Sequence, residues 1–122
     1  MALLESGEMY LETILVLSQT KPHVRAIDVG EYMGYSKPSV SRAMGLLKSG
    51  GYVAVSPEGH ITLTDAGREV AETIYERHTV LTNILTGLGV DPGIATEDAC
   101  KMEHHISDVS FQALKRHFET GV

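Results

Sequence analysis

Two short helical segments joined by a glycine turn, with a hairpin directly after them, constrain the fold of this chain more than any other feature. Residues 26–33 have the spacing of an amphipathic helix, and Gly34 marks a tight turn after it. Ser36 is a favoured N-cap residue, and Pro38 suits the first turn of a second helix whose apolar positions continue to Leu47. This pattern predicts a helix-turn-helix.

The segment that follows has the pattern of a β-hairpin. Residues 52–55 and 60–63 are strand-like, and residues 56–59, with the sequence Ser-Pro-Glu-Gly, are typical of a turn. A hairpin directly after a helix-turn-helix is a wing. We therefore predict a winged helix-turn-helix, in which the N-terminal part of the second helix enters the major groove of DNA.

Helical spacing dominates the rest of the chain. Apolar stripes predict helices over about 6–18, from Thr64 or Asp65 to about 87, over about 94–105, and from Ser107 or Asp108 through Phe118. We predict a mainly α fold, with a winged helix-turn-helix DNA-binding domain over 1–64 and an all-helical metal-binding and dimerisation domain over 65–122.

The net charge of −6 does not exclude binding to DNA, because the charge is uneven. Residues 1–64 carry five Lys and Arg against six Asp and Glu, a net charge of −1. Residues 65–122 carry five against ten, a net charge of −5. Acids in the second half that bind a cation are partly neutralised by it. The charge of the local surface therefore decides whether DNA can bind.

Composition points to the cytoplasm. No apolar run is long enough to cross a membrane, and the first residues lack the pattern of a signal peptide. A single cysteine excludes an internal disulfide, which fits a reducing compartment.

The run DACKMEHHISD over residues 98–108 contains the strongest chemical signal. Cys100, Glu103 and His104 stand at i, i+3 and i+4, so on a helix their donor atoms share one face. Thiolate, carboxylate and imidazole together suit a divalent transition metal such as iron, cobalt, nickel or zinc. Further ligands must come from other elements.

Two other helices offer them. Met9 and Glu12 stand at i and i+3 on the first predicted helix, and His78 lies in a polar stretch of the long helix. Six donors of mixed softness suit a five- or six-coordinate Fe(II) or Mn(II) site better than a closed tetrahedral zinc site. Taken alone, Met9 is more typical of core packing, and Glu12 is nearly as typical of a solvated surface.

The chain resembles the metal-dependent transcriptional repressors of the diphtheria toxin repressor and manganese transport regulator type. Five stretches in the family's order carry the resemblance: GEMYLETILVL (7–17), YSKPSVSRAMGLL (35–47), ITLTDAGREVA (61–71), ERHTVLTNIL (76–85) and EDACKMEHHISD (97–108). Because the sequence ends at Val122, we expect the two domains of the manganese type without the SH3-like third domain of longer iron-type members.

The resemblance implies a ligand set. The matching positions are Met9, Glu12, His78, Cys100, Glu103 and His104. Sulfur at Met9 and Cys100 is the iron-type choice, whereas Glu12 is the manganese-type choice, so Fe(II) and Mn(II) both stay open, with Co(II), Ni(II) or Zn(II) as substitutes in vitro. Thr82 and Thr96 replace ancillary ligands of the iron type, which leaves that site absent or rebuilt around Glu12 and His78.

The resemblance also implies a function: a homodimeric repressor of metal-uptake genes that binds a double-stranded DNA operator. It implies neither an enzyme nor a small-molecule substrate. The residues that we expect to contact DNA open the second helix of the helix-turn-helix: Ser36, Lys37, Pro38, Ser39, Ser41 and Arg42. Arg42 is the best candidate for a base contact, because its planar fork can pair with guanine.

Three other interpretations are open. A cluster such as Cys100, Glu103 and His104 can activate water in an enzyme, although no cleft or phosphate-binding glycine loop supports this. A winged-helix regulator that does not sense metal could use Cys100 as a redox switch. A purely structural metal site would unfold the dimer when the metal is removed.

Overall fold

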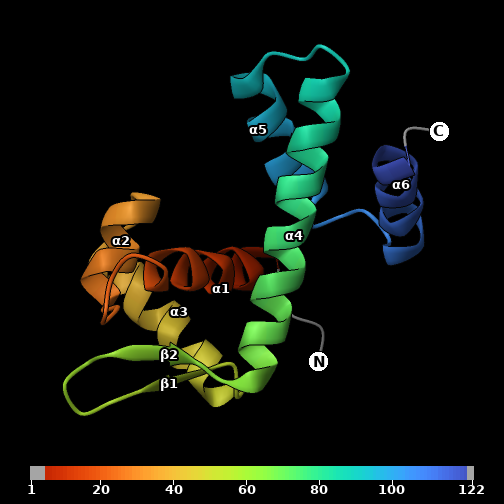
Figure 1. Cartoon of the computed structure of the whole chain (residues 1–122). Coiled ribbons are helices and arrows are strands. Elements are labelled where there is room, and N and C mark those ends of the chain that lie inside the picture. Colours follow the sequence, from red (N-terminus) through yellow and green to blue (C-terminus); the bar gives the residue numbers. More distant parts are fainter. Residues whose placement is uncertain (1–4, 121–122) are drawn as a thin grey trace. The chain divides into compact units, whose positions relative to one another are not determined.

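Within residues 5–120, which are those that the computed structural model describes, the chain forms six helices and a two-stranded sheet (Figure 1). The elements are α1 (Glu5–Ser18), α2 (Ala26–Met33), α3 (Lys37–Ser49), β1 (Val53–Val55), β2 (Ile61–Leu63), α4 (Asp65–Gly87), α5 (Pro92–Met102) and α6 (Asp108–Thr120). Contacts divide the chain into two compact units, Met1–Glu72 and Thr73–Val122, and α4 contributes to both. The predicted mainly α fold with a winged helix-turn-helix is confirmed.

Local backbone chemistry sets the helix-turn-helix. α2 ends at Gly34, whose left-handed φ of 73° favours glycine and whose N–H donates to the carbonyl of Gly30 at 2.8 Å. Ser36 caps α3 by accepting from the N–H of Ser39 at 3.4 Å, and Pro38 stands in the first turn. The turn is therefore made by the residues whose chemistry predicted it.

The wing is an antiparallel hairpin of β1 and β2. Its register pairs Val53 with Leu63 and Val55 with Ile61. The N–H of Ile61 also donates to the carbonyl of Val24 at 2.7 Å, so the segment before α2 joins the edge of the sheet. The hairpin is thereby fixed to the helix-turn-helix by backbone hydrogen bonds.

α4 begins where β2 ends, and Thr64 is its N-cap. The Thr64 hydroxyl accepts from the N–H of Gly67 at 3.2 Å and donates to the carbonyl of Gly51 at 2.6 Å. A β-carbon added at Gly67 would overlap the carbonyl oxygen of Tyr52. Glycine is therefore required for the first turn of α4 to lie this close to the start of the wing.

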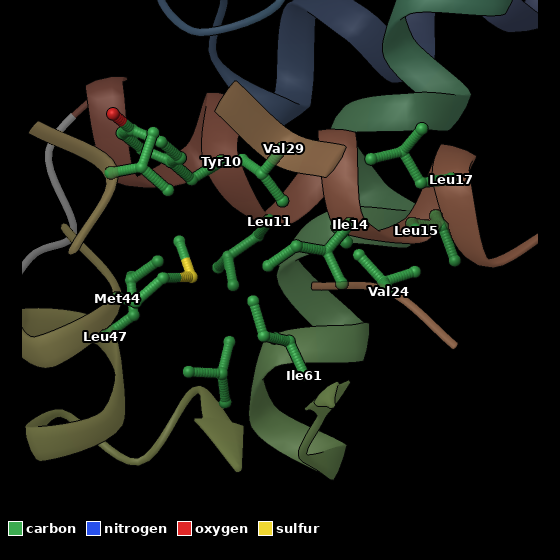
Figure 2. Packing of buried hydrophobic residues seen from close by; sticks show 13 residues of the cluster. Tyr10, Leu11, Ile14, Leu15, Leu17, Val24, Val29, Met44, Leu47 and Ile61 are labelled. Atoms are coloured by element: carbon green, nitrogen blue, oxygen red, sulfur yellow. The ribbon is translucent and has the colours of Figure 1, made fainter. Parts of the chain in front are cut away.

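Apolar side chains from α1, α2, α3 and the wing form the core of the first unit (Figure 2). Leu11 and Ile14 of α1 are at most 1% exposed, and Val29 of α2 and Val40 of α3 are equally buried. Full burial of such a side chain stabilises the fold by about 1.5–3 kcal/mol. This core orients α3 so that its opposite face meets solvent.

The second unit has a smaller core around the later part of α4. Leu81, Ala99 and Phe111 are buried in it, with Val80 and Ile106 partly buried beside them. Among residues 5–120, no helix combines the length and apolar character needed to cross a membrane.

α5 has other bounds than those expected from the sequence. It begins at Pro92, capped by the Asp91 carboxylate, and it ends at Met102, so the predicted bounds of 94 and 105 are wrong. The N–H groups of His105 and Ile106 both donate to the carbonyl of Met102 at 3.0 Å, which closes the helix in a tight turn. The donor-rich run therefore straddles a helix end.

Candidate metal centre and nucleic-acid interface

Three of the predicted metal ligands converge in the second unit. His78 comes from α4, Cys100 from α5, and Glu103 is the residue directly after α5. One ligand atom of each lies within 4.8 Å of the others. His78 Nδ1 is 2.8 Å from Glu103 Oε2. The structure thus brings together donors that are 25 residues apart in the sequence.

The donor set fits a divalent transition metal. Metal–ligand bonds of about 2.0–2.3 Å allow two ligands of one ion to lie up to about 4.5 Å apart, which is close to the observed spacing. The contact of His78 Nδ1 with Glu103 Oε2 is a hydrogen bond, with one proton between the two atoms. A cation bound at that nitrogen would displace the proton, so binding and pH are linked.

Glu103 is the centre of the cluster. Its side chain is fully buried, and a buried carboxylate is costly unless polar or charged groups surround it. Its Oε2 contacts His78, whereas its Oε1 is 3.4 Å from His104 Nε2. The two oxygens of one carboxylate therefore face two different imidazoles.

His104 differs from its expected position. The N–H of Glu103 still donates to the carbonyl of Ala99 at 2.9 Å, so Cys100 and Glu103 keep their shared helical face. His104, by contrast, lies in the turn beyond the helix, and the prediction that all three donors stand on one helix is wrong. Its imidazole reaches the cluster through the far oxygen of Glu103.

Met9 and Glu12 lie on α1 in the first unit. Both are half-buried, and their spacing places them on one face of the helix. The backbone carbonyl of Met9 accepts from the Thr13 hydroxyl at 2.9 Å. Their part in a metal site stays a prediction.

α3 presents the predicted DNA-contacting residues to solvent. Ser36, Lys37, Pro38, Ser39, Ser41 and Arg42 are all exposed. Val40, Met44 and Leu47 of the same helix are buried in the core of the first unit. The helix therefore has one face that packs in the core and one exposed face that is accessible to a groove of DNA.

Arg42 lines a shallow cavity of about 380 Å³ that the sequence did not predict. Its other lining residues include Tyr10, Tyr35, Ser39 and Leu46. Tyr10 and Tyr35 pack edge to face with ring centroids 5.9 Å apart. Burial, with a smaller contribution from Tyr35, raises the pKa of the Tyr10 hydroxyl above its usual value. Leu46, which also lines this cavity, is 69% exposed.

The turn end of the wing carries a second group that sequence reasoning missed. The rings of His23 and His60 stack with centroids 4.1 Å apart, and Arg25 Nη2 is 3.3 Å from His60 Nε2. At the turn, hydrogen bonds from its own backbone N–H and from Ser56 lower the pKa of Glu58. Arg25 and the two imidazoles thus lie near the turn end of the hairpin, close to the Glu58 carboxylate.

A winged helix-turn-helix joined to a helical unit with a thiolate, imidazole and carboxylate cluster defines a class of metal-responsive DNA-binding proteins. Two family profiles match the chain. Residues 2–61 match the profile described as iron dependent repressor, N-terminal DNA binding domain, and residues 64–120 match iron dependent repressor, metal binding and dimerisation domain. The chain belongs to the iron-dependent repressor family, as the resemblance predicted.

Individual relatives agree with this assignment. The chain is 34% identical over 106 residues to the transcriptional regulator MntR of Escherichia coli O157:H7, covering 87% of this chain and 68% of that one. It is 31% identical over 107 residues to the diphtheria toxin repressor of Corynebacterium glutamicum, covering 87% and 47%. A solved manganese-dependent transcriptional repressor complex with manganese superimposes with a TM-score of 0.82 and 27% identity, covering 90% and 51%. The chain thus spans about two thirds of that MntR and about half of the other two proteins.

Proposed function

We propose that this chain is a metal-dependent transcriptional regulator that represses metal-uptake genes as a homodimer on a double-stranded DNA operator, in the cytoplasm. One observation carries the proposal. A cluster of half-buried His78 and Cys100 with buried Glu103 lies in the same chain as a helix-turn-helix whose second helix is exposed along its candidate reading face. Such a chain has the parts needed to make DNA binding depend on a metal.

In this proposal His78, Cys100 and Glu103 hold the ion, and Met9, Glu12 and His104 complete its ligands. The ion supplies positive charge that neutralises the buried carboxylate of Glu103. Sulfur donors favour Fe(II), whereas the carboxylates favour Mn(II). The matching family profile is described as iron dependent, and a similar solved structure is a manganese-dependent repressor. The proposed cofactor is therefore Fe(II) or Mn(II).

Ligands on α1 would couple metal binding to the position of the DNA-reading helix. α1 packs against α2 and α3 through Leu11 and Ile14, so a ligand on α1 is mechanically tied to the reading helix. We propose that coordination by Met9 and Glu12 restrains the first unit and sets the spacing of the two reading helices in the dimer. The free protein would sample other spacings and bind the operator less tightly.

We expect operator affinity to rise 5–150-fold when metal is added, which is the usual range of coupling between two sites. The probe is a short fluorescent duplex selected from a randomised pool by the metal-loaded protein. Anisotropy is measured anaerobically at one salt concentration, first with chelator and then with Fe(II), Mn(II), Co(II) or Zn(II). The metal that raises the operator affinity most is the one identified as the cofactor.

Other outcomes would point to the competing interpretations. Affinity that is unchanged by chelator but lost with peroxide would replace metal sensing by a redox role for Cys100. Loss of the folded dimer on chelation would indicate a structural metal. Failure to select any duplex would contradict DNA binding itself.

Arg42→Ala should weaken operator binding by about 1–3 kcal/mol and relax sequence preference at one base pair per half-site. Lys48→Ala, in the last turn of the same helix, is the matched control: it should weaken binding to all sequences alike and reduce the salt dependence. Anisotropy titrations against single-base operator variants distinguish the two patterns. If the Arg42 variant lost the same affinity for every operator variant, Arg42 would not be a base-contacting residue.

A further inference from the structure

Arg77, the neighbour of His78 on α4, is braced across the turn that carries Glu103. Its side chain is only 14% exposed. Its Nη1 donates to the backbone carbonyls of Glu103 at 3.2 Å and Ile106 at 3.1 Å. These two carbonyls bracket the turn of residues 103–106, which we call the donor turn. A single side chain thus fixes both ends of it.

The same guanidinium also reaches α6. Its Nη2 is 3.7 Å from Asp108 Oδ1, in the first turn of that helix. Its central carbon stands 5.7 Å from the centroid of the Phe111 ring, which is buried in the core of the second unit. A cation over an aromatic face is attracted by the ring, so Arg77 is held by α6 while it holds the donor turn.

The donor turn needs this brace because α5 ends at Met102. The carbonyls of Glu103 and Ile106 lie just beyond the last residue of α5, and a cationic side chain is a favourable donor to carbonyls at a helix C-terminus. Arginine can serve two carbonyls in one plane while stacking on a ring, whereas lysine is a point charge and cannot do all three. The chemistry of the position therefore calls for arginine.

We propose that Arg77 is a positioning residue of the metal centre: it sets the donor turn so that the Glu103 carboxylate meets His78 and Cys100, and it ties that geometry to the start of α6. The proposal rests on the proposed function, since it assumes that the cluster binds metal. α4 then supplies both a ligand and the brace for another ligand. By linkage, metal binding and the anchoring of α6 strengthen each other.

Arg77→Lys tests the proposal through metal affinity. Anaerobic titration with Co(II), followed by the thiolate-to-cobalt absorption of Cys100 and the visible ligand-field bands, gives a Kd and a signature of the ligand set. We expect Arg77→Lys to raise the Kd 10–100-fold, the usual effect of losing a group that orients a ligand, and to alter the ligand-field bands. Arg68→Lys, an exposed arginine in an i,i+4 pair with Glu72, should leave both unchanged.

A merely structural role for Arg77 would lower the thermal midpoint of the metal-free protein but leave the Kd and the bands of the folded fraction as in the wild type. That result would overturn the proposal. If wild-type protein shows no thiolate-to-cobalt band, the proposed function fails first and this inference falls with it. The two failures are therefore distinguishable.

A second variant covers the case in which Arg77→Lys does not fold. Asp108→Lys changes a side chain that is 71% exposed, and Ser107, whose hydroxyl accepts from the N–H of Ser110, still caps α6. It places a like charge opposite the guanidinium, and we expect the Kd for Co(II) to rise about fivefold or more, within the usual range of coupling between neighbouring sites. Asp108→Asn is the neutral control. Equal Kd values for the two variants and wild type would overturn the proposal.

Discussion

Glu103→Gln abolishes the metal-stimulated part of DNA binding: operator affinity stays at its chelator value when Fe(II) or Mn(II) is added, so the whole 5–150-fold gain is lost. Glutamine keeps the size and the position of the side chain. It removes the negative charge that faces His78 and His104, and a neutral amide is a poor ligand for a divalent ion. The measurement is the anisotropy titration with and without chelator.

The thermal stability of the same variant gives an independent measurement. A ligand present at 100 times its Kd stabilises the folded state by about 2.7 kcal/mol, so wild-type protein should melt at a higher temperature with metal. Glu103→Gln should lose that shift. The control is His105→Gln, which changes an exposed imidazole of the same turn outside the three-donor group. A Glu103→Gln protein that still responds to metal would remove Glu103 from the ligands.

Gly67→Ala should lower the free energy of unfolding by about 3 kcal/mol, at the upper end of the usual cost of overpacking. The added methyl group overlaps the carbonyl oxygen of Tyr52, which also accepts from the N–H of Thr64 at 3.1 Å. The obstacle is backbone, so no side-chain rotation relieves it. Either α4 shifts off the wing or the wing loses this bond. Urea denaturation followed by circular dichroism measures the loss.

Gly45→Ala is the matched control for this substitution. Gly45 lies within α3, and a β-carbon there meets nothing within 4 Å. Alanine is favoured over glycine inside a helix, so this variant should be more stable by about 0.5–1 kcal/mol. Equal effects of the two substitutions would show that the contact with Tyr52 does not limit the fold.

Turn chemistry made the first unit predictable from the sequence. Gly34, Ser36 and Pro38 have strong local preferences, and the structure uses each of them as those preferences dictate. The helical spacing of α3 also indicates which of its apolar residues are exposed, and Leu46 is an example. Of the adjacent leucines 46 and 47, only Leu47 continues the inward spacing of α3. The spacing therefore implies that Leu46 is exposed, although we did not predict this from the sequence.

The candidate metal centre was predictable only in part, because local periodicity reaches no further than one helix. It relates Cys100 to Glu103, whereas the contact of Glu103 with His78 depends on how α4 packs beside α5. The end of α5 was missed for the same reason. Arg77 supplies donors to carbonyls in the turn after that helix, and nothing in residues 94–105 records a partner 26 residues away.

The half-buried thiol of Cys100 has a practical consequence. It is the one cysteine in the sequence, and it belongs to the three-donor group. A sulfur bound to an ion is a poor nucleophile toward an alkylating reagent, while the same sulfur without the ion reacts according to its thiolate fraction and access. If Cys100 binds the ion as proposed, the mass added by a brief pulse of iodoacetamide would count the molecules that lacked metal at that moment. Metal occupancy could then be measured in a cell extract without purification or a fluorescent probe.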